Sequence, residues 1–212
     1  RYDLVNITRQ VLANRARSLY AAMNSAYDSG SVPVFRQLSR SFLDLIADED
    51  RLLRSQREFL LGPWLAGARK RGGTSSDRRW LEWDARTLIT TWSDTVDSVN
   101  DYSCREWSGL LSDYYLPRWR LFIRNALQQL EARRAGRSVP GIADTVYFQL
   151  EARWARGHRP YPVTPRGDPL QLSLNLFRKY RSSFIKRLLS WQDHSALPGG
   201  RVTAHAGSSP GS

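Results

Sequence analysis

Residues 34–53, VFRQLSRSFLDLIADEDRLL, carry apolar side chains at steps of three and four residues. These side chains are Phe35, Leu38, Phe42, Leu45, Ile46, Leu52 and Leu53. Because an α-helix turns once in roughly 3.6 residues, this spacing places them all on one helical face. The chain offers no alternating apolar and polar runs between hairpin turns, which would predict strands. The segment therefore predicts a buried helix and, with its neighbours, an all-α fold.

Helical spacing continues on both sides of this segment and predicts about eight helices in one bundle-like domain over residues 1–190. The expected helices lie near residues 1–25, 34–53, 59–65, 75–92, 101–111, 117–130, 142–156 and 170–190. Breaks fall at glycine and proline, most clearly in the GSVP run at 30–33 and the three prolines of 157–168. In the fourth helix we expect Trp80, Trp83, Leu88 and Ile89 to point inward. Residues 191–212 are rich in small and polar residues and predict a flexible, disordered tail.

The charge of the chain is strongly positive, with 32 basic and 20 acidic residues in 212 and a net charge of +12. Nearly all of the positive charge is arginine, which favours an anionic partner or an acidic face of another domain. Most arginines are spread along helical faces near acidic residues, so we favour solvated faces and pairing between domains over a nucleic-acid surface. A basic nucleic-acid-binding protein and a non-catalytic helical scaffold remain the alternatives. No apolar run approaches the roughly 20 residues of a membrane span.

Motifs for phosphate loops, zinc sites and common catalytic centres are absent from the sequence, and we expect neither a metal nor a cofactor. The consecutive acids Asp48, Glu49 and Asp50 point in different directions on a helix and predict a solvated helix end. The single cysteine, Cys104, predicts a buried and inert thiol. Asn6 begins the triplet Asn-Ile-Thr, which is a candidate site of N-glycosylation.

The segment 92–120, WSDTVDSVNDYSCREWSGLLSDYYLPRWR, has the most unusual composition in the chain. Trp92 and Tyr102 flank a polar loop at 93–100, where an aromatic ring can stack on a sugar while its polar edge stays in water. For Asp101 we expect an N-cap of the following helix. Trp107 and Trp119 are expected to pack in the core.

Several motifs in a fixed order give this chain a resemblance to a known family. They include RYDL at 1–4, REFLLG at 57–62, NDY at 100–102, WSGLL at 107–111, DYYLPRW at 113–119 and PRGD at 165–168. In these motifs the chain resembles the C-terminal helical region of the α-N-acetylglucosaminidase family, retaining glycosidases that remove terminal α-linked N-acetylglucosamine. The resemblance covers residues 1 to about 185, and the WSGLL and YYLPRW runs are its most specific parts.

The resemblance implies an upstream (β/α)₈ barrel that holds both catalytic carboxylates, so no catalytic residue is expected in this chain. Retaining chemistry uses two carboxyl groups about 5–5.5 Å apart. The helical domain would pack on the barrel and complete the sugar pocket with Trp92, Val99 and Tyr102. Ser103 stands where the family usually has Ala. Arg118 is expected to have a structural role, paired with an acid such as Asp113.

The resemblance also implies a glycan of the heparan sulfate type as the partner and a lysosomal or secreted location. It implies neither nucleic acid nor a membrane as a partner. A homo-oligomer is left open.

Overall fold

The computed structural model describes the backbone of residues 1–96 and 103–194 and the side chains of these residues up to 182. Val99, Asp101, Tyr102 and the segment 195–212 lie outside the described residues. The expectations for a pocket role of Val99 and Tyr102, for a cap at Asp101 and for a disordered tail therefore stay predictions.

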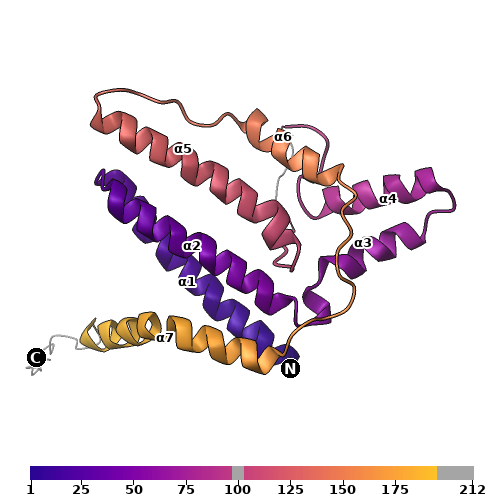
Figure 1. Ribbon diagram of the computed structural model, residues 1–212, viewed down its shortest axis with the longest axis horizontal. Helices are drawn as coiled ribbons and strands as arrows, with labels where there is room; N and C mark the ends of the chain where they lie inside the picture. Colours follow the sequence, from indigo (N-terminus) through magenta and orange to yellow (C-terminus); the bar gives the residue numbers. More distant parts are fainter. Residues whose placement is uncertain (97–102, 195–212) are drawn as a thin grey trace, which may run out of the picture. The chain divides into compact units, whose positions relative to one another are not determined.

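The described part of the chain is helical and contains no strand longer than an isolated bridge, which confirms the all-α class (Figure 1). The α-helices are α1 Tyr2–Asp28, α2 Val32–Leu53, α3 Leu61–Lys70, α4 Ser75–Leu88, α5 Leu116–Arg134, α6 Asp144–Ala155 and α7 Pro169–His194. A 3₁₀ turn covers Arg57–Phe59, and a π-helical turn, η2, covers Leu111–Tyr115 and leads into α5.

The chain divides into two compact units, Arg1–Leu174 and Asn175–Ser212. Helix α7 begins in the first unit and continues into the second. Every contact discussed below lies within the first unit.

Helices α1 and α2 run side by side, and α5 packs against α2 (Figure 1). Their contact faces carry the three- and four-residue apolar spacing of the sequence. The buried members are Val5, Leu12, Leu19, Met23, Phe35, Phe42, Leu45, Leu52, Leu53, Ile123 and Leu130. Burial of each such side chain contributes roughly 1.5–3 kcal/mol, so this stripe supplies much of the stability of the unit.

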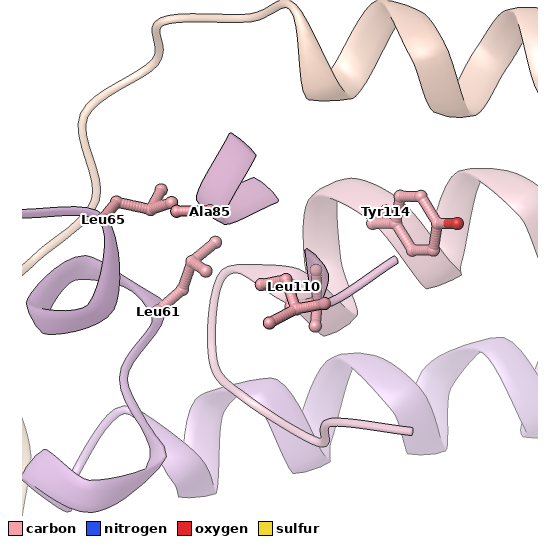
Figure 2. Close-up of a cluster of buried hydrophobic side chains, with 6 residues drawn as sticks. Leu61, Leu65, Ala85, Leu110 and Tyr114 are labelled. Carbon is pink, nitrogen blue, oxygen red and sulfur yellow. The ribbon is translucent and has the colours of Figure 1, made fainter. Parts of the chain in front are cut away.

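A second apolar cluster lies where α3, α4 and η2 meet (Figure 2). It consists of Leu61, Leu65, Ala85, Ile89, Leu110 and Tyr114. Two glycines allow the backbones to approach there. A Cβ at Gly109, whose φ is +94°, would lie 2.6 Å from the ring of Tyr161, and a Cβ at Gly62 would clash with the carbonyl of Pro162. The WSGLL and REFLLG motifs are thus explained by packing against the 157–168 connection.

The prediction of which α4 residues point inward is wrong in part. Trp80 is 59% exposed and Leu88 is 39% exposed, whereas the charged residues Glu82 and Arg86 are buried. Only Ile89 of the expected inward residues is fully buried in the core. The helix begins with a capping box in which the side chains and backbones of Thr74 and Asp77 bond to each other.

The expected helix over 101–111 is also wrong in its described part. Residues 103–109 are not helical; instead Ser108 pairs with the residues flanking Leu60, donating its N–H to Phe59 and accepting from the Leu61 N–H. The apolar residues of this stretch therefore belong to a bridge and to the π-helical turn that follows it, not to an α-helix. The helix predicted over residues 75–92 is present as α4, but it ends at Leu88.

Candidate functional site

The segment that the sequence predicts as a polar loop, 93–100, follows a conformationally unusual residue. Trp92 follows the end of α4, its side chain is 47% exposed, and its φ is 60°. A bulky residue in this left-handed region is rare and strained, which favours a functional role when the surroundings hold it there. Its N–H donates to the carbonyl of Thr87 at 2.9 Å, so the start of the loop is bonded to the last turns of α4.

The first described residue after this segment, Ser103, is bonded to the same end of α4. The Ser103 hydroxyl donates to the carbonyl of Ile89 at 3.0 Å. The next residue, Cys104, has a φ of 43°, and among the described residues Trp92 and Cys104 are the two positions other than glycine with positive φ. The hydroxyl of Ser103 thus ties the start of the segment 103–106 to the end of α4.

Cys104 is exposed, which corrects the expectation of a buried thiol. The expectation placed Cys104 on a helix that shares a face with Trp107, whereas residues 103–106 are not helical.

The segment after the loop is held by a buried carboxylate. Oδ1 of Asp50 accepts the Gly109 N–H at 2.7 Å and the Ser112 N–H at 3.3 Å, and Oδ2 accepts the Ser108 hydroxyl at 3.3 Å. Arg54 forms an ion pair with Oδ2 at 3.0 Å. Because hydrogen bonds to a charged group are strong, Asp50 anchors the WSGLL motif to the end of α2.

The prediction of a solvated helix end for Asp48, Glu49 and Asp50 is wrong, since all three are buried, with exposed fractions of 5%, 5% and 3%. Asp48 pairs with Arg51, and Asp50 holds the WSGLL motif. Burial of consecutive helical residues requires partners on several sides, and α1, η2 and the segment 103–109 supply them.

Glu49 lines a pocket of about 350 Å³ together with apolar side chains of α1, α2 and α5. Its Oε1 atom has no hydrogen-bond partner among the described residues. Burial, followed by the neighbouring charge of Glu106, raises the pKa of the Glu49 carboxyl to about 8, although the charge of Arg9 lowers it. Arg9 forms an ion pair with Glu106. Glu49 is therefore a neutral acid in the folded protein at neutral and acidic pH.

Other buried charges hold the helices of the unit together. Glu82 pairs with Arg86 at 2.8 Å and with Arg69 at 3.0 Å. Arg118 pairs with Glu151 at 2.7 Å, not with Asp113 as expected.

Asp113 instead accepts a 2.9 Å hydrogen bond from the hydroxyl of Tyr161 and forms an ion pair with Arg159 at 2.8 Å. Burial and this carboxylate raise the pKa of Tyr161. Arg159 thus joins the arginines that form ion pairs within this domain, whereas the sequence predicted solvated faces and pairing between domains.

Two further expectations concern ligands and glycans. The described residues contain no cluster of three or more His, Cys, Asp or Glu side chains that could hold a metal ion. Asn6 lies in α1 and is partly buried, and its amide oxygen accepts two hydrogen bonds from Arg9, at 2.9 and 3.2 Å. Glycosylation of Asn6 stays a prediction. In the described part of the chain no helix is long and apolar enough to cross a membrane.

The described fold is that of an all-helical domain, in which buried carboxylates bind the backbone and the exposed Trp92 follows α4. Residues 1–179 match the family described as the alpha-N-acetylglucosaminidase (NAGLU) C-terminal domain, and the chain belongs to this family. The family predicted from the sequence motifs is thereby confirmed.

Two relatives show the extent of this similarity. The chain is 31% identical over 189 residues to alpha-N-acetylglucosaminidase of Homo sapiens, covering 87% of this chain and 25% of that protein. It also matches the Clostridium perfringens enzyme CpGH89, solved in complex with its substrate GlcNAc-alpha-1,4-galactose, with 32% identity and a TM-score of 0.75. That match covers 84% of this chain and 20% of the other.

A second structure, the family 89 glycoside hydrolase of the same bacterium in complex with PUGNAc, matches equally well and covers 21% of that chain. The chain thus spans a fifth to a quarter of the length of these relatives.

Proposed function

We propose that this chain is the C-terminal helical part of an enzyme that removes terminal α-linked N-acetylglucosamine from a glycan. The relatives it matches are glycoside hydrolases, and the chain accounts for only their C-terminal domain. We further propose that the substrate is of the heparan sulfate type and that the enzyme is lysosomal or secreted. An arginine-rich chain with a net charge of +12 suits an anionic glycan.

The catalytic carboxylates belong, in this proposal, to an upstream barrel. Three of the buried acids in this chain, Asp50, Glu82 and Glu151, support this division. Asp50 and Glu82 are fixed in contacts with backbone or arginine, and Glu151 is paired with Arg118. Acids held in this way stabilise the fold and are poor candidates for proton transfer to a sugar.

The role of this domain is to shape and dry the sugar pocket, with Trp92, Val99 and Tyr102 facing the terminal sugar. The observation that carries this role is the exposed Trp92, held at positive φ by the end of α4. An exposed indole at a strained loop end offers a flat apolar surface suited to the face of a sugar ring.

The test compares Trp92, which follows α4, with Trp80 within α4, in an enzyme that contains this chain. Trp92→Ala should raise KM for a terminal α-N-acetylglucosaminide about tenfold, the equivalent of one lost aromatic contact of about 1.4 kcal/mol. Trp80→Ala removes a more exposed tryptophan from α4 itself and should leave KM unchanged. Equal KM values for the Trp92→Ala variant and the unaltered enzyme would refute the pocket role.

A further inference from the structure

The segment 103–106 lies directly after the predicted sugar-pocket loop, and its described contacts come from three elements. Ser103 is bonded to the end of α4, and Glu106 is paired with Arg9 of α1. The third element is α2, whose Glu49 lines the same pocket as Cys104, Arg105 and Glu106. The position of the segment therefore depends on the charges that meet at this pocket.

The charged and titratable groups around Glu49 come from each of these elements. Arg9 and Arg17 belong to α1, Asp48 and Asp50 to α2, Cys104, Arg105 and Glu106 to the segment, and Tyr115 to η2. The remaining wall of the pocket is apolar.

The cation whose charge acts on Glu49, Arg9, is already engaged. Arg9 is paired with Glu106 and also donates to Asn6. A negative charge on Glu49, which is 5% exposed, would compete with Glu106 for the Arg9 guanidinium. Like charges that share a cation in a poorly hydrated site destabilise each other.

We infer that Glu49 is a positioning residue that, as a neutral carboxylic acid, lets the Arg9–Glu106 ion pair hold the segment 103–106 in place. Ionisation of Glu49 draws Arg9 away from Glu106 and releases the segment. An effect of this release on sugar binding rests on the proposed function, because the segment directly follows Tyr102, which we propose to face the sugar. The raised pKa of Glu49 agrees with this geometry.

Cys104 provides a local probe, because it is the only cysteine of the chain and is exposed within the segment. Alkylation with a trifluoromethyl reagent places a fluorine label there, and its ¹⁹F chemical shift is followed from pH 5.5 to 9.5. We expect a titration with a midpoint near 8 in the labelled 212-residue chain and none in Glu49→Gln. The Glu49→Gln variant retains the amino terminus and the three histidines, so it controls for their titration.

Two further variants distinguish this role from a merely structural one. Glu106→Gln removes the like charge and should lower the midpoint by about one pH unit or more, whereas Arg9→Gln should raise it. An unchanged midpoint in both variants, or a titration that persists in Glu49→Gln, would overturn the inference.

The consequence for the sugar is measured separately in an enzyme that contains this chain. Between pH 6 and pH 8.5, KM should rise about threefold more in the unaltered enzyme than in Glu49→Gln, with kcat affected equally in both. A fluorine titration without this difference in KM would overturn the link to the sugar pocket while leaving the local role of Glu49 intact. An inactive enzyme with the expected titration would refute the proposed function alone.

Discussion

Arg86→Met is the perturbation that most directly tests the buried charges of this domain. The exposed fraction of Arg86 is 1% and that of its partner Glu82 is 3%. Arg86 donates to Oε1 of Glu82 at 2.8 and 3.2 Å and to the carbonyl of Arg159 at 3.0 Å. Its guanidinium also lies over the ring of Trp154, 4.9 Å from the centroid. The methionine side chain fills a similar space but leaves the carboxylate without this partner.

The expected magnitude follows from what remains around Glu82. Removing one partner of a buried ion pair typically costs about 3–5 kcal/mol, because the other charge is left buried. Here Arg69 still contacts Oε2 at 3.0 Å, which places the loss at the lower end, about 3–4 kcal/mol. Adding Glu82→Gln to Arg86→Met should recover about half of this loss, because the unpaired charge is then gone.

The assay is urea denaturation followed by circular dichroism at 222 nm. Tryptophan fluorescence is not used, because the substitution changes the surroundings of Trp154 directly. Arg36→Met is the matched control, since Arg36 pairs with Glu131 at the same 2.8 Å but both side chains are about half exposed. An exposed pair of this kind contributes at most about 1 kcal/mol. The reasoning would be refuted if Arg86→Met cost no more than Arg36→Met, or if the double variant were less stable than Arg86→Met alone.

Four other substitutions test the remaining contacts. Gly109→Ala should destabilise by about 3 kcal/mol in urea titrations, because positive φ and the ring of Tyr161 both oppose a Cβ; a loss below about 1 kcal/mol would contradict this. Asp50→Asn should cost about 2–3 kcal/mol and increase amide hydrogen exchange at Gly109 before the global transition; uniform exchange would contradict the anchoring role. Ser103→Ala should cost about 1 kcal/mol, measured by thermal unfolding, with Ser18→Ala as an exposed control. Because the pKa of Glu49 is raised in the fold, its contribution to stability declines as pH rises from 4.5 toward about 8. Relative to Glu49→Gln, the free energy of unfolding of the unaltered chain should fall by about 2–3 kcal/mol between pH 5 and pH 7. A difference between the two chains that does not change with pH would contradict the raised pKa.

The helices and the family could be predicted from the sequence because both are encoded locally. Apolar residues at three- and four-residue steps, such as those around Phe42, predicted most of the helices, although the stretch 103–109 shows that the pattern alone is not sufficient. Glycine and proline mark the breaks, as at Gly30, where φ is positive and α1 has ended. The ordered motifs identified the family without any knowledge of their contacts.

The contacts of charged side chains could not be predicted in this way. Asp50 and Gly109 are bonded across 59 residues, and Arg86 and Arg159 across 73. No local pattern distinguishes an acid on a solvated helix from one that meets backbone N–H groups of a distant segment. The burial of Glu49 and Asp50, and the exposure of Trp80, therefore contradicted expectations drawn from spacing alone.

The candidate site shows the same division between sequence and structure. From the sequence came Trp92 and the polar loop that follows it, since aromatic and polar composition is a property of the segment itself. The tertiary structure alone revealed the strained backbone of Trp92 and Cys104, and it also brought Glu49 next to Glu106. Periodicity determines which elements form because each helix bonds within its own few turns. Long-range packing decides which charges are buried and paired, because those partners meet only after the helices have assembled.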